Sequence, residues 1–272
     1  MLHDHQKGTA RRDDAASLAA GVMAGDIRAV ARVITLLEHR SPVGAAVLEQ
    51  LEQRPPEAMV LGITGYPGSG KSTLIDQLIT AYRRLGKQVA ILAVDISSPV
   101  TGGAILGDRI RMQQHAEDRL VYIRSMATRG HQGGLACATG EAVRVLDAAA
   151  YDVILIETVG VGQGDIEVLQ VAQTVVAITA PGLGDGIQAM KAGLLEVADI
   201  VVVNKADHPD ADRTLRDLRE QRSLVLRTIA LRGEGIPELV AVIAEQQRVK
   251  DLELPAGQDS RQPALTWTES GG

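Results

Sequence analysis

The sequence is poor in aromatic residues and in cysteine. Its 272 residues include no Phe, one Trp, four Tyr and one Cys. A single thiol, Cys137, excludes the internal disulfide framework that is typical of small secreted domains. With so few aromatic side chains, Ala, Val, Leu and Ile must fill the core. Together with 28 glycines, this composition favours a parallel sheet covered by helices over an antiparallel sandwich.

Long apolar runs and an excess of positive charge are also missing. No stretch approaches the roughly 20 apolar residues that span a membrane, and the first residues lack the apolar segment of a signal peptide. The formal net charge of −6 disfavours nucleic acid as a partner, since phosphates are neutralised by a basic face. We therefore expect a cytoplasmic protein that binds neither membranes nor nucleic acid.

The hydrophobic pattern divides the chain into three parts. Residues 1–56 carry apolar side chains at helical spacing, which predicts a small N-terminal segment of two or three short helices. Residues 57–250 alternate apolar runs with amphipathic stretches and form the predicted main domain. Residues 255–272 are rich in Gly, Pro, Ser and Gln, and we expect a disordered tail over residues 251–272.

The apolar runs of the main domain are short, nearly continuous and rich in Val, Ile and Leu. They cover residues 59–64, 89–94, 120–123, 153–156, 175–179, 200–203 and 224–229. Such runs predict strands buried on both faces, and helix-length segments such as 72–85, 133–149 and 188–197 separate them. The sequence therefore predicts an α/β fold of the P-loop NTPase type, with a doubly wound, mostly parallel sheet flanked by helices.

The first predicted strand runs into a glycine-rich segment that matches the pattern G-x-x-x-x-G-K-[ST]. Its residues are Gly65, Tyr66, Pro67, Gly68, Ser69, Gly70, Lys71 and Ser72, followed by Thr73. Glycines let successive backbone N–H groups turn toward phosphates, and the following helix adds its partial positive charge. We expect a nucleoside triphosphate here, with Lys71 on its β- and γ-phosphates and Ser72 on Mg²⁺. The alternative is an unoccupied glycine-rich turn.

Three acidic residues are candidates for further magnesium ligands, directly or through water. Asp95 and Glu157 each end a predicted strand, where ligands of doubly wound sheets gather, and Asp108 lies in a glycine-rich loop. The alternative for each is a helix N-cap. Residues 157–160 also match the [DE]-x-x-G switch of GTPases, so the Gly160 amide is expected on the γ-phosphate unless this is a passive turn. The candidate catalytic residues are Lys71, Asp108, Glu157 and Gly160.

A second motif, Asn204-Lys205-Ala206-Asp207, follows a predicted strand and indicates which base is bound. Guanine presents N1–H and a 2-amino group side by side, and the Asp207 carboxylate accepts both. Adenine lacks the 2-amino group and leaves that carboxylate poorly paired. We expect the Lys205 stem over the base plane, Asn204 bracing neighbouring loops, and the Ala230 amide on the guanine carbonyl. The predicted ligands are GTP or GDP with Mg²⁺.

Together these motifs resemble the methylmalonyl-CoA mutase-associated GTPases, the MeaB/ArgK-like family among the metallocentre-assembly and cobalamin-linked P-loop GTPases. The matching stretches are residues 62–75, 95–112, 129–136, 157–163, 180–199 and 203–207. The resemblance implies a GTPase chaperone for an adenosylcobalamin-dependent acyl-CoA mutase, which gates cofactor loading or protects the mutase. It also implies that Asp95, Asp108 and Glu157 are linked to magnesium.

Family members usually continue into a C-terminal helical extension that pairs two subunits, and residues 258–272 do not resemble it. A homodimer therefore remains open.

Two other functions compete with this interpretation. A nickel-delivery GTPase would need clustered soft ligands, and the candidates are His3, His5 and Cys137. A small-molecule kinase would need an acceptor pocket and a positioned base, neither of which the sequence identifies. Because no glutamine directly follows Gly160, we expect slow intrinsic GTP hydrolysis that a partner accelerates.

Overall fold

The computed structural model describes residues 14–52, 56–95, 115, 117–127, 134–158, 167, 169–183, 194–222 and 224–253. The side chains of Asp95, Ala127 and residues 134–136 are outside this description. The chain divides into two compact units. The first unit contains residues 1–59 and 79–155, and the second contains residues 60–78 and 156–272.

Seven strands form one sheet in the order β3-β2-β4-β1-β5-β6-β7. They are β1 Met59–Gly65, β2 Val89–Asp95, β3 Val121–Ala127, β4 Val153–Thr158, β5 Thr174–Thr179, β6 Ile200–Val203 and β7 Val225–Arg227. The pairs β2–β3, β1–β5, β5–β6 and β6–β7 are parallel. β1 lies in the middle of the sheet, with β4, β2 and β3 on one side and β5, β6 and β7 on the other, so the predicted doubly wound sheet is confirmed.

The strands owe their burial to the continuous apolar runs. Every residue of β4, β5 and β6 is buried, as is every residue of β1 after Met59. The third strand is longer than its apolar run, because the polar residue Arg124 inside it finds partners on a helix. Its guanidinium donates to the Ala31 carbonyl at 3.2 Å and to Thr35 Oγ1 at 3.0 Å, and pairs with the Glu38 carboxylate.

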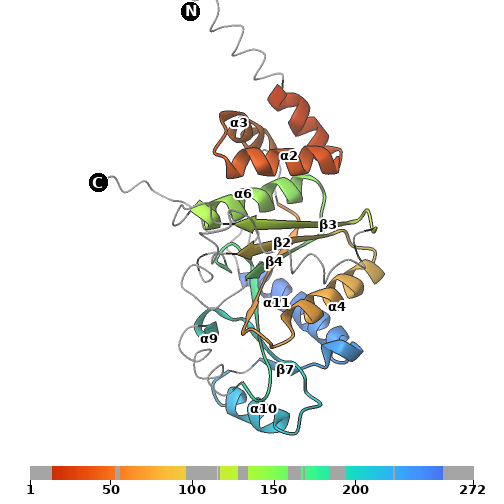
Figure 1. The fold of residues 1–272 in the computed structure, drawn as a ribbon, viewed down its shortest axis with the longest axis vertical. Helices are drawn as coiled ribbons and strands as arrows, with labels where there is room; N and C mark the ends of the chain where they lie inside the picture. The colour runs from red at the N-terminus through yellow and green to blue at the C-terminus, as the bar shows by residue number, and fades with distance from the viewer. Residues whose placement is uncertain are drawn as a thin grey trace, which may run out of the picture. The chain divides into compact units, whose positions relative to one another are not determined.

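In the first unit, the N-terminal helices pack against a helix from the middle of the chain. Residues 14–23 are helical, and α2 (Ile27–Glu38) and α3 (Pro42–Leu51) lie beside α6 (Gly134–Ala148), as Figure 1 shows. Asp26 is the N-cap of α2, since its carboxylate accepts from the Arg28 amide at 2.8 Å. The division into three parts at residues 56 and 250 remains a prediction.

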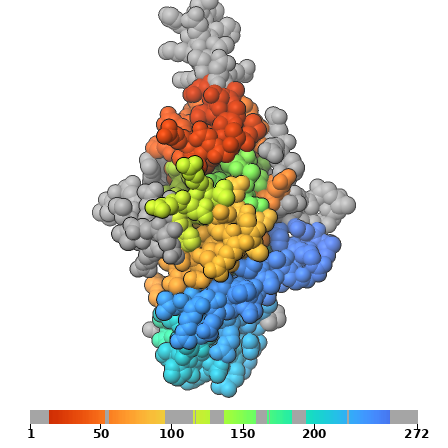
Figure 2. Space-filling view, turned by 90° about the vertical axis from the view of Figure 1, so that its right-hand side faces the viewer, coloured from red at the N-terminus to blue at the C-terminus, as the bar shows by residue number. Residues whose placement is uncertain are grey.

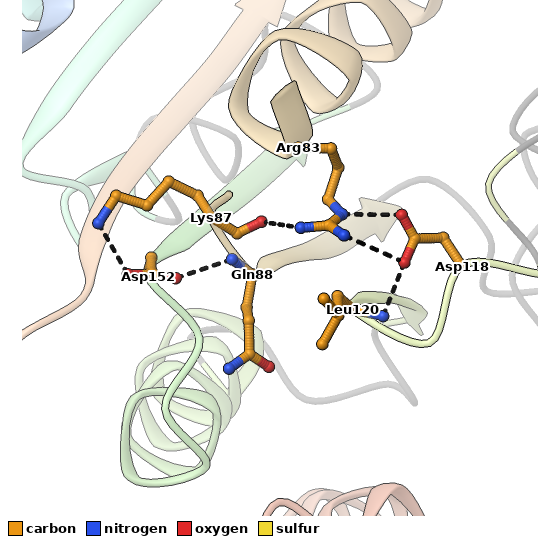
Figure 3. Close-up of polar contacts among 6 residues, drawn as sticks. All are labelled: Arg83, Lys87, Gln88, Asp118, Leu120 and Asp152. Carbon is orange, nitrogen blue, oxygen red and sulfur yellow. Dashed lines mark hydrogen bonds and ion pairs between the residues drawn. The ribbon is translucent and has the colours of Figure 1, made fainter. Parts of the chain in front are cut away.

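A polar network fixes the start of β2 in the first unit (Figure 3). Arg83, near the end of α4 (Lys71–Arg84), donates to the Asp118 carboxylate at 2.7 Å and to the Lys87 carbonyl at 2.6 Å. The Asp152 carboxylate pairs with Lys87 at 2.9 Å and accepts from the Gln88 amide at 2.7 Å. These bonds hold Lys87 and Gln88, immediately before β2, to α4 and to the segment that precedes β4.

The second unit contains the remaining helices. These are α9 (Leu195–Val197), α10 (Ala211–Arg219), the 3₁₀ turn η3 (Ala230–Arg232) and α11 (Ile236–Glu253). Figure 2 shows the outer surfaces of α10 in cyan and α11 in blue. Most of the helix predicted at 188–197, and the tail after residue 253, lie outside the described residues. None of the helices within the described ranges is long and apolar enough to cross a membrane.

Candidate functional site

The glycine-rich segment connects the end of β1 at Gly65 to the start of α4 at Lys71. Gly65 has φ +149°, and a Cβ atom there would lie 2.2 Å from the Ile178 carbonyl oxygen on β5. Gly70 has φ +89°, and its Cβ would lie 2.3 Å from Asn204 Nδ2. Only glycine fits either position, so the predicted strand–loop–helix setting of this segment is present.

The first turn of α4 carries the residues predicted to meet phosphate and metal. Lys71 Nζ donates to the Gly65 carbonyl at 3.4 Å, so the ammonium lies over the loop that precedes it. Ser72 and Thr73 follow on the same turn and are partly exposed. This turn presents the positive end of the helix dipole together with the Lys71 charge, which suits a polyphosphate.

Asn204, directly after β6, ties three segments of the second unit together. Its Nδ2 donates to the Ser69 carbonyl at 2.9 Å, although the two residues are 135 positions apart. Its Oδ1 accepts from Thr228 Oγ1 at 3.1 Å and from the Ala230 amide at 3.0 Å. Asn204 is 3% exposed, so all three bonds are shielded from water. The side chain thus links the glycine-rich loop, the end of β6 and the turn after β7.

Lys205 and Asp207 follow Asn204 in the same motif, and unlike Asn204 both are exposed to solvent. Lys205 has φ +55°, rare for a residue with a side chain, and its Nζ donates to the Gly68 carbonyl at 2.7 Å. The lysine stem therefore spans from the segment after β6 to the glycine-rich loop. The Asp207 carboxylate is about half exposed, and its Oδ2 lies 3.5 Å from a guanidinium nitrogen of Arg232.

A cavity of about 540 Å³ opens at this place. It is lined by Gly70, Thr73, Asn204, Lys205, Asp207, His208, Pro209, Ile229, Ala230 and Leu231. One wall comes from the glycine-rich loop and the first turn of α4, and the other from the segments that follow β6 and β7. The volume is in the usual range for a small-molecule site, and the lining combines apolar side chains with a few polar and charged ones, among them the Asp207 carboxylate.

The Ala230 amide is engaged by Asn204 Oδ1. The predicted bond from this amide to a guanine carbonyl therefore requires it to share its hydrogen with Asn204 or to leave it.

The acidic candidates are described unequally. Glu157 is the penultimate residue of β4 and is 2% exposed, so it belongs to a strand and is not a helix N-cap. Asp95 is the last residue of β2, in the first unit, and its side chain is outside the description. Asp108 and Gly160 lie outside the described residues. Within the described part of the chain, no three His, Cys, Asp or Glu side chains gather as metal ligands would.

The described oxygen donors nonetheless suit magnesium. Ser72 offers a hydroxyl and Glu157 a carboxylate, and oxygen is the ligand that this cation prefers. Their roles as metal ligands remain predictions.

Several residues of the site lie outside the two motifs that the sequence shows. Thr228 reaches Asn204 from the end of β7, and Leu231 and Arg232 belong to the turn that follows. They arrive because β7 pairs with β6, with Val203 opposite Arg227. The sequence feature that could have identified Thr228 is its position at the end of the first predicted strand after the Asn-Lys-x-Asp motif.

The fold and the site together define a P-loop GTPase, an enzyme that hydrolyses GTP. The defining features are the doubly wound sheet, the glycine-rich loop between β1 and α4, and the Asn-Lys-x-Asp segment that is joined to that loop. The chain belongs to the family described as methylmalonyl Co-A mutase-associated GTPase MeaB, whose model matches residues 30–270. The family expected from the sequence is therefore confirmed.

Individual relatives agree with this assignment. The chain is 48% identical over 237 residues to a protein of Pyrococcus horikoshii named as a GTPase, covering 82% of this chain and 75% of the relative. It is 32% identical over 298 residues to the mouse mitochondrial "methylmalonic aciduria type A homolog", covering 98% and 72%. The crystal structure of a "LAO/AO transport system kinase" superposes with a TM-score of 0.68 at 27% identity, covering 86% and 75%.

Proposed function

We propose that this GTPase requires magnesium and acts as a chaperone for an adenosylcobalamin-dependent acyl-CoA mutase of the methylmalonyl-CoA mutase type. In this proposal GTP binding and hydrolysis gate the loading of the cofactor or protect the mutase. The observation that carries the nucleotide part is the cavity lined by Asp207, Lys205 and Gly70, in which Lys205 bonds to the glycine-rich loop.

The base would lie in this cavity. The Asp207 carboxylate accepts N1–H and the 2-amino group of guanine, while the Lys205 stem, held to Gly68 at 2.7 Å, lies along the base plane. Asn204 contributes indirectly, because it fixes the loops on either side. Adenine has no 2-amino group and its N1 is an acceptor, so it would offer Asp207 neither donor, which favours guanine.

The phosphates would lie over the first turn of α4. Lys71 and the backbone amides of the glycine-rich loop stabilise the negative charge that develops on the phosphoryl oxygens as water attacks the γ-phosphate. Ser72 and Glu157 would hold Mg²⁺, which when bound supplies positive charge to the β- and γ-phosphate oxygens. Asp95, Asp108 and Gly160 remain proposed as further ligands and as part of the switch.

The partner is proposed from family membership. The matching family is described as mutase-associated, and the mouse relative is named for methylmalonic aciduria. No property of the described residues themselves identifies the mutase, so the test must supply candidate partners.

The first experiment measures GTP hydrolysis by the purified protein, alone and with each adenosylcobalamin-dependent mutase of the same organism. We expect slow turnover alone, below about 1 s⁻¹ on the scale of arginine-assisted GTPases. One mutase should raise the rate and co-elute with the protein only in a particular nucleotide state. GTP-specific hydrolysis that no mutase changes would remove the chaperone role and leave the GTPase.

The second experiment tests the base. Asp207→Asn should weaken GDP binding and increase the relative affinity for XDP, because the amide donates to the 2-carbonyl of xanthine. Competition binding with GDP, XDP and ADP measures this. Asp212→Asn is the matched control, since Asp212 is exposed on α10 and lines no part of the cavity. Unchanged selectivity of Asp207→Asn would show that another group reads the base.

Two further measurements distinguish the competing functions. A small-molecule kinase would transfer the γ-phosphoryl to an added metabolite in place of water, and product analysis separates the two. A nickel-delivery GTPase would bind nickel stoichiometrically. Of the candidate nickel ligands, His3 and His5 lie outside the described residues, which themselves hold no group of three His, Cys, Asp or Glu side chains.

A further inference from the structure

The carboxylate proposed to read the base has a cationic partner. One terminal nitrogen of Arg232 lies 3.5 Å from Asp207 Oδ2, and the other lies 3.8 Å from the Glu234 carboxylate. Asp207 lines the cavity, whereas Arg232 is not among the lining residues. Asp207 therefore has the cavity on one side and a guanidinium on the other.

The turn that carries Arg232 is closed by its own backbone bonds. The Ile229 amide donates to the Glu234 carbonyl at 3.0 Å, and the Arg232 amide donates to the Ile229 carbonyl at 2.8 Å. Gly235, at φ +79°, is so close to Arg227 that a Cβ would lie 2.3 Å from the Arg227 carbonyl oxygen. The backbone that presents Arg232 thus has a defined geometry.

This turn is also joined to the motif that contains Asp207. The Ala230 amide donates to Asn204 Oδ1, and Asn204 lies three residues before Asp207. Arg232 and Asp207 therefore leave two segments that are linked by a buried hydrogen bond. This link holds the two backbone segments close enough for the side chains of Arg232 and Asp207 to meet.

We propose that Arg232 is a positioning residue for guanine recognition, a role that rests on the proposed base-reading function of Asp207. By donating to Oδ2 from outside the cavity, Arg232 fixes the rotation of the carboxylate and leaves lone pairs of both oxygens facing the cavity. A carboxylate has about four acceptor positions, so the guanidinium and the two donors of guanine fit at the same time. Glu234 in turn holds the other end of the guanidinium.

The expected effect of Arg232 on GDP binding follows from how exposed the Arg232 and Asp207 side chains are. Arg232 is 60% and Asp207 44% exposed, so the pair is screened by water. Exposed pairs of this kind correspond to about a 1.5- to 5-fold change in an equilibrium constant. We expect Arg232→Met to weaken GDP binding by about 2- to 5-fold, and high salt to reduce the difference.

The experiment measures GDP affinity by calorimetry for wild type, Arg232→Met, Asp207→Asn and the double variant. If Arg232 acts through Asp207, its substitution changes GDP affinity less than about 1.5-fold in the Asp207→Asn background. Arg232→Lys should restore part of the affinity, because it returns the charge without the planar fork. Arg216→Met, an exposed arginine on α10 outside the cavity lining, controls for the lost charge.

The outcomes distinguish a failure of the Arg232 proposal from a failure of the base-reading function proposed for Asp207. If wild type does not prefer GDP to ADP, or Asp207→Asn leaves that preference intact, the base-reading function fails. If Asp207→Asn behaves as expected but Arg232→Met binds GDP equally or more tightly, Arg232 does not position the carboxylate, and tighter binding would mean that it competes with guanine. Equal losses in both backgrounds would also overturn the proposal, since they would assign Arg232 to general stability.

Discussion

Replacing Asn204 by alanine removes a side chain that makes three hydrogen bonds with almost no exposure to water. It leaves the Ser69 carbonyl and the Ala230 amide without these partners, and it frees the Thr228 hydroxyl to rotate. A buried polar group left without a partner costs about 1–3 kcal/mol, and a hydroxyl that finds another acceptor costs less.

The cavity limits the total loss. Asn204 is itself part of the cavity lining, so water can enter the vacated space and replace some of the lost bonds. We therefore expect the free energy of unfolding to fall by about 2–4 kcal/mol, which is roughly 5–15 °C in melting temperature for a chain of this size.

Urea and thermal unfolding followed by circular dichroism measure the change, and calorimetry with GDP measures binding. Gln50→Ala is the control, because Gln50 also donates to a backbone carbonyl but is exposed on α3, where such a loss is within about 0.5 kcal/mol. An Asn204→Ala variant as stable as this control, with normal GDP affinity, would refute the idea that Asn204 links the three segments.

Two further predictions concern the glycine-rich loop and the network before β2. Gly70→Ala places a Cβ atom 2.3 Å from Asn204 Nδ2 at φ +89°, so we expect at least a tenfold loss of GDP affinity, measured by calorimetry. The pKa of Asp118 is lowered, mainly by its hydrogen bond from Arg83 and then by that from the Leu120 amide. A lowered pKa stabilises the folded protein above the unfolded value near 4 and loses this contribution as the pH falls through the folded value. Urea unfolding between pH 6 and pH 3 should therefore show a weaker pH dependence for Asp118→Asn than for wild type, and identical slopes would contradict the assignment.

The sequence was most informative where chemistry is local. The glycine-rich loop and the Asn-Lys-x-Asp segment are each contiguous in the sequence, and the roles predicted for them follow from the chemistry of phosphate and guanine. The continuous apolar runs also predicted the buried strands, because each strand of a covered parallel sheet is apolar on both faces.

The sequence was least informative where a residue depends on a distant partner. The apolar run that predicts β3 ends at residue 123 because Arg124 is polar. The strand nevertheless extends to Ala127, since Arg124 bonds to Thr35 and Glu38. Thr228 and Arg232 join the site because β7 pairs with β6, and no spacing in the sequence encodes that pairing.

The bonds of Asn204 have a consequence for the protein before it meets any partner. The cavity is assembled from segments 135 and 26 residues apart, so it exists in the folded chain and not in the unfolded one. A nucleotide that binds there is therefore a ligand of folding, and at 100 times its dissociation constant it adds about 2.7 kcal/mol to the folded state. The guanine nucleotide supply of the cell would then help to set how long each copy of the protein survives proteolysis.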